Sequence, residues 1–223
     1  KTGRIRNGAA LFDWSGSAFQ VEAAGGLSMM PPHPLFFSSP IMPRDIVYFD
    51  LETRRTANDV GGWGNKHKMG VSVAVTYSTK LQEYLIYTED EISDLVHQMV
   101  RADLVVGFNH ISFDYEVLLG HTVFDFREQL RSLDLLVELE QKLGHRLKLE
   151  AVAAATLGTG KTADGLEAIR WWQQGKMAEI AEYCCYDVKV TKCIHEYGAK
   201  HGHVKYHDRN GREQSVAVEW SID

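Results

Sequence analysis

Short runs of apolar and β-branched residues mark the chain from residue 46 onward. The runs Ile46–Asp50 and Leu104–Phe108 are typical of buried strands. Val71–Tyr77 and Leu81–Tyr87 alternate between apolar and polar positions on either side of three residues, Ser-Thr-Lys. This alternation predicts an antiparallel hairpin.

Apolar positions with helical spacing fill much of the remaining chain. Thr88 and Glu91 have the spacing of a capping box, and Ile92, Leu95 and Met99 follow at helical intervals. Further helices are predicted at about residues 113–120, 135–143, 149–157 and 176–199, and a C-terminal β-hairpin at about 203–220. Three strands in a meander, then a helix, a strand and mainly helices, predict an α/β sandwich around a mixed sheet.

The proline distribution divides the chain into two parts. All five prolines lie between Pro31 and Pro43. We therefore expect an N-terminal arm and Pro-rich linker over residues 1–43, and a folded domain over residues 44–223. Within that domain, the Gly-rich segment 61–70 is expected to form a mobile loop.

Composition and charge narrow the class of protein. With 44% hydrophobic and 24% charged residues, the 223-residue chain is unlike collagen, coiled coils or wholly disordered proteins. No apolar run approaches the roughly 20 residues of a membrane-spanning helix. The net charge of −6 argues against binding nucleic acid by bulk electrostatics. A chain that opens at Lys1 is expected to be a piece of a longer protein.

Three cysteines, two of them adjacent, do not form a disulfide framework and suggest a reducing cytoplasm. A zinc site is an alternative, but the cysteine and histidine spacing matches no common ligand pattern. We interpret these residues as core thiols and surface imidazoles: Cys184, Cys185, Cys193, His195, His201 and His203.

The first candidate for chemistry is the Asp50-x-Glu52 pair at the end of the first strand. Side chains two residues apart on a strand share a face, so both carboxylates project to one side. Burying two carboxylates is unfavourable unless a partner compensates, and a divalent cation does so. The alternative is that both point into solvent, and the same spacing recurs at Asp114 and Glu116.

Two further motifs follow along the chain. Asn109-x-x-x-Phe113-Asp114 comes directly after the strand ending at Phe108. Its alternative interpretation is an Asx turn that caps a helix. Tyr183-x-x-x-Asp187 lies on the last long helix, where an i, i+4 spacing places both side chains on one face. Val190 and Ile194 continue that face, which directs Asp187 inward.

Together, in this order, the three motifs resemble the signature of the DEDD 3′–5′ exonucleases of the ribonuclease-H-like superfamily. Tyr183 indicates the tyrosine subclass, to which ribonuclease D and polymerase proofreading domains belong; the histidine subclass has His where this chain has Glu182. More loosely, DGLEAIRWW and IAEYCCYDV are similar to exonuclease domains attached to some bacterial helicases. The resemblance covers about residues 44–200 and implies a three-layer ribonuclease-H-like α/β sandwich, with a mixed five-stranded sheet, its first strand central and helices on both faces.

The resemblance also implies a reaction and a ligand set. Phosphodiester bonds would be hydrolysed at 3′ ends with two Mg²⁺ or Mn²⁺ ions, about 4 Å apart. Asp50 would bridge the ions, Glu52 and Asp187 would hold the ion that carries the attacking water, and Asp114 the other. Tyr183 would orient that water, because its ordinary pKa of about 10 does not suit a base.

The expected substrate is a single-stranded 3′ end of DNA or RNA, and the expected covalent partner is a helicase or another module. Candidate substrate contacts are Leu51, Thr53, Trp63, Asn109 and Phe113. Trp63 is available to stack on a base, or alternatively packs on the sheet. Basic residues flank its loop: Arg54, Arg55, Lys66 and Lys68.

Other functions remain open. A catalytically silent nucleic-acid-binding or docking module fits the same fold, and so does an endonuclease, because no motif encodes the need for a free 3′ end. The segment Ala155–Thr162 is close to a phosphate-binding loop, but Ala155 replaces the strict Gly and the preceding residues favour a helix over the required strand. No motif distinguishes DNA from RNA.

Overall fold

The structure, a computed structural model, describes residues 4–7, 10–12, 44–159 and 165–222. Five strands of the domain form a mixed sheet in the order β5-β4-β3-β6-β7. They are β3 (Ile46–Thr53), β4 (Val71–Ser78), β5 (Glu83–Tyr87), β6 (Leu104–Gly107) and β7 (Ser132–Asp134). β3 pairs antiparallel with β4 and parallel with β6, so the first strand of the domain is central, as predicted.

Two strands near the N-terminus extend this sheet, which the sequence pattern did not predict. β1 (Arg4–Asn7) pairs parallel with β5, and β2 (Ala10–Phe12) pairs antiparallel with β1. The sheet formed by the described residues therefore has seven strands. The Pro-rich part of the expected arm, residues 13–43, lies outside the described residues.

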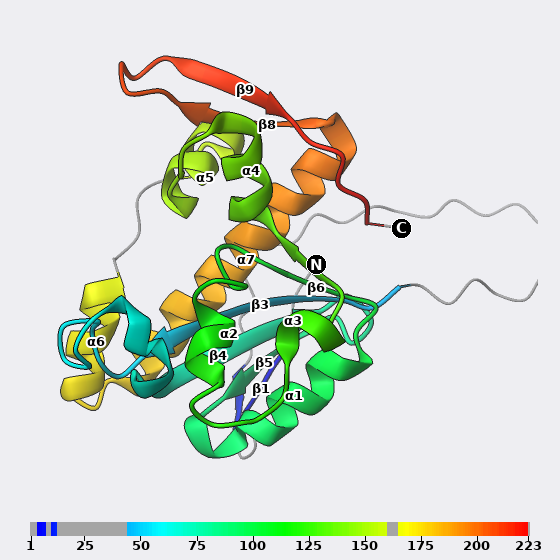
Figure 1. Cartoon of the computed structure of the whole chain (residues 1–223). Coiled ribbons are helices and arrows are strands. Elements are labelled where there is room, and N and C mark those ends of the chain that lie inside the picture. Colours follow the sequence, from blue (N-terminus) through cyan, green and yellow to red (C-terminus); the bar gives the residue numbers. More distant parts are fainter. Residues whose placement is uncertain (1–3, 8–9, 13–43, 160–164, 223) are drawn as a thin grey trace, which may run out of the picture.

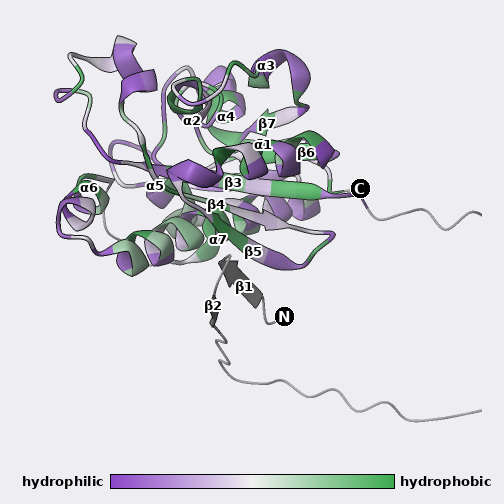
Figure 2. Ribbon diagram, turned by 90° about the horizontal axis from the view of Figure 1, so that it is seen from below, coloured by the Kyte–Doolittle hydropathy of each residue, from purple (hydrophilic) through white to green (hydrophobic). Residues whose placement is uncertain are grey.

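Helices cover both faces of the sheet, and Figure 2 shows the sheet between α1 and α7. The helices are α1 (Ile92–Arg101), α2 (Asp114–Leu118), α3 (Phe126–Gln129), α4 (Leu135–Leu143), α5 (Leu149–Leu157), α6 (Gly165–Gln173) and α7 (Met177–His201). The bounds of α4 and α5 match the predicted ranges, and α7 ends two residues later than predicted. This three-layer arrangement confirms the predicted fold class.

Alternation along β3 assigns its side chains to two separate cores. Ile46 and Tyr48 pack in the cluster that includes α7, whereas Phe49 and Leu51 pack with α1 and α2. Because successive side chains of a strand point to opposite faces, Asp50 continues the α7 face. The central strand thus delivers its carboxylates toward the long helix.

The Gly-rich segment 61–70, which the sequence predicted as a mobile loop, forms turns and a short 3₁₀ helix, η1 (Trp63–Lys68). The segment lies directly on α2, since a Cβ at Gly120 would stand 1.9 Å from the carbonyl oxygen of His67. Met69 is buried immediately after η1. Only a residue without a side chain at position 120 allows this close backbone approach.

The predicted C-terminal hairpin is confirmed as β8 (His203–His207) and β9 (Glu213–Ala217), which lies beyond α4 and α5 in Figure 1. His195 corrects the interpretation of the histidines as surface side chains. It is fully buried, and its Nδ1 hydrogen-bonds to the Tyr48 hydroxyl at 2.9 Å. Its ring lies 5.9 Å from that of Trp220, which closes this end of the core. None of the described helices has the length and apolarity needed to cross a membrane.

Candidate active site

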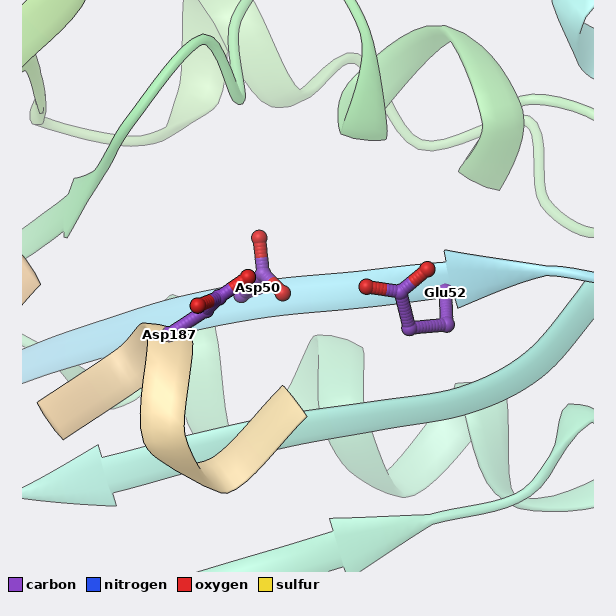
Figure 3. A group of neighbouring side chains, drawn as sticks. All are labelled: Asp50, Glu52 and Asp187. Carbon is purple, nitrogen blue, oxygen red and sulfur yellow. The ribbon is translucent and has the colours of Figure 1, made fainter. Parts of the chain in front are cut away.

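Asp50, Glu52 and Asp187 form a compact group of carboxylates between β3 and α7. One ligand oxygen from each residue lies within 4.8 Å of the others. Figure 3 shows Asp50 and Glu52 extending from β3 and Asp187 from the turn of α7 that faces them. Two of the three predicted motifs, 135 residues apart in sequence, therefore meet at one point.

The packing of α7 fixes the direction of Asp187. Ile180 and Val188 are fully buried on the same helix, and Val190 and Ile194 are also buried, as the sequence pattern indicated. These apolar anchors hold one face of α7 against β3 and β4. Asp187 is half-buried on this face, and the packing of α7 directs its carboxylate toward β3.

Asp114 reaches the same region from the other side of β3. Because β3 and β6 are parallel, the turn that follows β6 lies at the same edge of the sheet as the end of β3. Asp114 is 3% exposed, and its Oδ1 accepts a hydrogen bond from the backbone N–H of Leu51 at 3.1 Å. It thus lies beside the backbone between Asp50 and Glu52, although it is not one of the three clustered carboxylates.

Burial and mutual repulsion make these carboxylates hard to ionise in the metal-free protein. Burial raises the pKa of Asp50 well above its ordinary value, and the charges of Asp114, Asp187 and Glu52 raise it further. The pKa of Glu52 is raised by burial and then by Asp187 and Asp114. Burial also raises the pKa values of Asp114 and Asp187. Ionising the site would therefore accumulate negative charge that no basic side chain among the described residues balances.

The donor set fits hard divalent cations such as Mg²⁺ or Mn²⁺. All candidate ligand atoms are carboxylate oxygens, which these ions prefer. Among the described residues, none of the clustered carboxylates forms an ion pair with Lys, Arg or His. Buried like charges without a basic partner call for cationic compensation, and we conclude that the residues present fit a divalent cation.

Tyr183 lies next to this group, one helical turn before Asp187. It is 9% exposed, and its hydroxyl and the Asp187 carboxylate are near enough to shift each other's pKa. Burial, followed by the charges of Asp187, Glu52 and Asp50, raises its pKa. The phenol therefore stays protonated at neutral pH, which suits a hydrogen-bond donor or orienting group and excludes a phenolate base.

The predicted substrate contacts fall into two groups. Leu51 and Thr53 are buried, and the Thr53 hydroxyl donates to the Arg55 carbonyl oxygen at 3.1 Å. Asn109 adopts a left-handed backbone with φ of 70°, and its Oδ1 accepts a hydrogen bond from Arg146 Nη2 at 2.6 Å. The side chains of Leu51 and Thr53 thus lie inside the protein, and the amide oxygen of Asn109 has a protein partner.

Trp63 and Phe113 form the second group of predicted substrate contacts. Trp63 is 67% exposed, and its ring lies edge-on to that of Phe113, with 6.3 Å between the centroids. Phe113 immediately precedes Asp114. An aromatic pair therefore stands beside the acidic group, and Trp63 does not pack on the sheet as the alternative interpretation expected.

The basic residues near the site are partly engaged by protein groups. Arg54 Nη1 bonds to Glu89 Oε1 at 2.7 Å, and its guanidinium lies 4.4 Å from the ring centre of Trp172. Arg55 Nε donates to the carbonyl oxygen of Met69 at 3.3 Å. Lys68 on η1 is exposed. Arg55 therefore holds the end of the loop directly, whereas the Arg54 side chain joins the end of β3 to Glu89 and α6.

Two features of the site were not found by sequence reasoning. Cys184 is fully buried, and its thiol donates to Asp50 Oδ2 at 3.4 Å; only its position next to Tyr183 could have suggested this contact. The start of α6 approaches Glu52, since a Cβ at Gly165 would lie 3.9 Å from Oε2. Trp171 of α6 contacts Tyr183 edge-on, with centroids 6.2 Å apart, which agrees with a packing role for this tryptophan.

The fold and the acidic cluster together define a class of protein. It is a three-layer α/β sandwich in which the central strand, the turn after β6 and the last long helix supply carboxylates to one site. Residues 47–199 match the family model RNase_H_2, described as the RNase_H superfamily. The chain belongs to this superfamily, as the motifs predicted. The family and the cluster together support a nuclease.

Among solved structures, the chain is similar to the family B DNA polymerase from the hyperthermophilic archaeon Pyrobaculum calidifontis. The TM-score is 0.53 with 17% identity, over 84% of this chain and 26% of the polymerase chain. At this identity the likeness concerns the fold alone, and the chain spans about a quarter of the polymerase's length. No curated protein matches the chain.

The phosphate-loop alternative finds no support in the described part of its segment. Ala155–Leu157 form the end of α5, and Gly158 terminates that helix in a left-handed conformation, with φ of 68°. A phosphate-binding loop instead follows a strand and opens a helix. Residues 160–162 of the motif lie outside the described residues.

Proposed function

We propose that this protein is a divalent-metal-dependent 3′–5′ exonuclease that hydrolyses phosphodiester bonds of DNA or RNA and releases nucleoside 5′-monophosphates. The observation that carries the proposal is the convergence of Asp50, Glu52 and Asp187 within 4.8 Å. Tyr183 lies one helical turn before Asp187, and Asp114 bonds to the Leu51 N–H between Asp50 and Glu52, which supports the roles that the motif resemblance implies. Membership of the RNase H superfamily supports the reaction class.

Bound Mg²⁺ or Mn²⁺, as a pair of ions, would supply an activated water and stabilise the leaving oxygen. By the motif resemblance, Asp50 would contribute ligand oxygens to both ions, Glu52 and Asp187 would help to hold one of them, and Asp114 would help to hold the other. The Cys184 thiol donates a hydrogen bond to Oδ2 of Asp50. The other carboxylate oxygen, Oδ1, is then free to act as a ligand.

Tyr183 orients the attacking water through its hydroxyl. Its edge-on contact with Trp171 of α6 fixes the ring between α6 and α7. A positioned donor lowers the barrier because its orientation is set before the reaction begins. Proton removal from water then falls to the carboxylate cluster and solvent, since the phenol keeps its own proton.

The substrate end is a single-stranded 3′ terminus that reaches the carboxylates past Trp63 and Phe113. Stacking on an aromatic ring accepts any base, because every base has a π-face. The exposed ring of Trp63 supplies such a surface, whereas the Leu51 and Thr53 side chains are buried and Asn109 is held by protein groups. A linked helicase or other module and a cytoplasmic location complete the proposal.

The test uses single strands labelled at the 5′ or the 3′ end, incubated with Mg²⁺, with Mn²⁺ or with a chelator. A 3′–5′ exonuclease shortens the 5′-labelled strand stepwise and releases the 3′ label as a mononucleotide, only with metal. Internal fragments from a circular strand would favour the endonuclease. Binding without any cleavage would favour the silent nucleic-acid-binding module.

A further inference from the structure

Asp134 is another buried carboxylate close to the acidic cluster, and no motif includes it. It ends β7 and is 3% exposed. Its Oδ1 accepts hydrogen bonds from the backbone N–H groups of Leu136 at 3.0 Å and Val137 at 3.3 Å. Two further N–H donors reach the same carboxylate: Asn109 at 2.7 Å and Ile111 at 3.0 Å. Four backbone donors therefore converge on one side chain.

These four bonds belong to two different structures. Leu136 and Val137 open α4, so their bonds make Asp134 the N-cap of that helix. Asn109 and Ile111 belong to the turn after β6, 23 to 25 residues earlier in the chain. A helix cap needs only the first pair of bonds. The second pair joins the turn to the end of β7.

The turn that Asp134 holds is the one that places Asp114. Asn109 has a left-handed backbone, a conformation that asparagine adopts more readily than most residues with a side chain. The turn continues through bonds from Phe113 N to Asn109 O at 3.0 Å and from Tyr115 N to His110 O at 2.9 Å. Asp114 then accepts from Leu51 N at 3.1 Å.

A matched case within the protein shows what capping alone looks like. Asp125 caps α3 through bonds from Arg127 N at 3.1 Å and Glu128 N at 3.2 Å, the same two-bond geometry. Asp125 is exposed and has no bond to the 109–114 turn among the described residues. Asp134 differs from it by its burial, by the two added bonds and by the buried His110 ring, whose Nδ1 lies 3.6 Å from Asp134 Oδ2.

We propose that Asp134 is a positioning residue of the nuclease site: it fixes the 109–114 turn and thereby the distance between Asp114 and Asp50. This inference rests on the proposed function, because it assumes that Asp114 is a metal ligand. Removing the bonds to Asn109 and Ile111 should let the turn relax and separate the two carboxylates. Metal binding at the position that Asp114 serves should weaken first, because Glu52 and Asp187 stay in place.

The test compares Asp134→Ser with Asp125→Ser. Serine remains a good N-cap, but it is too short to reach Asn109 and Ile111, so the helix cap survives and the turn loses its anchor. Mn²⁺ binding is titrated calorimetrically and the melting temperature is recorded for both variants and the parent. We expect Asp134→Ser to weaken the Asp114-dependent metal step by about 10–100-fold, the range typical of residues that orient metal ligands. Asp125→Ser should leave both metal steps unchanged.

A second variant covers the case in which Asp134→Ser does not fold. Asp134→Asn keeps the size of the side chain but sets an amide donor against one N–H group, and it should shift the same metal step in the same direction. Unchanged Mn²⁺ binding in either folded variant would overturn the inference. A parent protein that binds no Mn²⁺ would instead overturn the proposed function, so the two failures are distinguishable.

Discussion

Two buried polar regions lie side by side between β3 and α7, and their chemistry differs. At one, Tyr48 of β3 meets His195 of α7 in a hydrogen bond of 2.9 Å between neutral groups. At the other, Asp50, on the same face of β3, meets Asp187, two helical turns earlier on α7. The first region pairs two neutral groups, with Nε2 of His195 left without a hydrogen-bond partner among the described residues, and the second brings together groups of the same charge sign.

The comparison separates a stabilising polar contact from a functional one. Burial lowers the pKa of His195 to about 4, so it is neutral at pH 7 and burying it requires no counter-charge. Burial and neighbouring carboxylates raise the pKa of Asp50, so its charged form opposes folding. Such a cluster persists where a ligand compensates it, and this contrast is the physical basis of the metal-site proposal.

The largest expected effect is that of Asp50→Asn. Loss of the bridging carboxylate should lower kcat at least about 10³-fold, more than loss of a single hydrogen-bond donor typically costs. Asp94→Asn, on the exposed side of α1, should have no such effect. Near-normal turnover of the Asp50 variant at millimolar Mg²⁺ would remove Asp50 from the site.

The metal-free Asp50→Asn variant should be more stable than the parent, although its activity is lower. Because the folded-state pKa of Asp50 is raised, its ionised form destabilises the metal-free protein at pH 7, and this penalty disappears as pH falls below about 4. Asp50→Asn should therefore raise the melting temperature in chelator at pH 7. Mn²⁺ should raise the melting temperature of the parent and not that of the variant.

Tyr183→Phe should have the next largest effect on catalysis. Removing one positioned donor typically costs about 10²–10³-fold in rate. The ring still packs against Trp171, so the melting temperature should change little, and calorimetric metal affinity should stay within a few fold. Asp187→Ala should weaken both rate and metal affinity. Unchanged turnover with a lowered melting temperature would make Tyr183 a core residue only.

Trp63→Ala tests the substrate side of the site. Stacking of a base on an aromatic ring contributes about 1–3 kcal/mol. The variant should lose that much in kcat/KM on an ordinary single strand but little on a strand whose terminal nucleotides are abasic. Leu81→Ala is the control, because Leu81 is 51% exposed in the β4–β5 connection, at the opposite end of β4 from η1. Equal losses on both substrates would contradict stacking.

The smallest effect on activity is expected at the Tyr48–His195 contact. Since the folded-state pKa of His195 lies near 4, below its ordinary 6.5, its contribution to stability is complete above pH 6.5 and is lost as pH falls toward 4. The loss is about 3 kcal/mol. His195→Asn should flatten the dependence of the unfolding free energy on pH, measured by urea denaturation, and leave kcat unchanged. A large fall in kcat would instead mean that the Tyr48–His195 contact is part of the active site.

The sequence predicted those parts of the fold that a local pattern of hydrophobic residues determines. The strand at residues 46–53, the hairpin after it and helices α4 and α5 were predicted because each carries its own hydrophobic period. β7 is three residues long, too short to show a period. The pairing of β1 with β5 joins residues almost 80 positions apart and leaves no local signal.

The residues of the candidate site divide in the same way, into those that a local sequence pattern predicts and those that depend on long-range contacts. The motifs placed Asp50, Glu52, Tyr183 and Asp187 correctly on a strand end and an inward helix face, because periodicity fixes which face a residue occupies. Asp134 was missed, although an Asp directly before a helix is a cap signal. Its bonds to the distant 109–114 turn depend on β6 and β7 lying in parallel, which only the assembled sheet provides.

The central claim is that the carboxylates between β3 and α7 form a divalent-metal site. Anomalous diffraction from a crystal of the protein soaked in Mn²⁺ with a nucleoside 5′-monophosphate tests it most directly. The account predicts two manganese peaks about 4 Å apart, one against Glu52 and Asp187, one against Asp114, and Asp50 between them. Ordered manganese elsewhere on the protein, with the four carboxylates free of it, would contradict the claim.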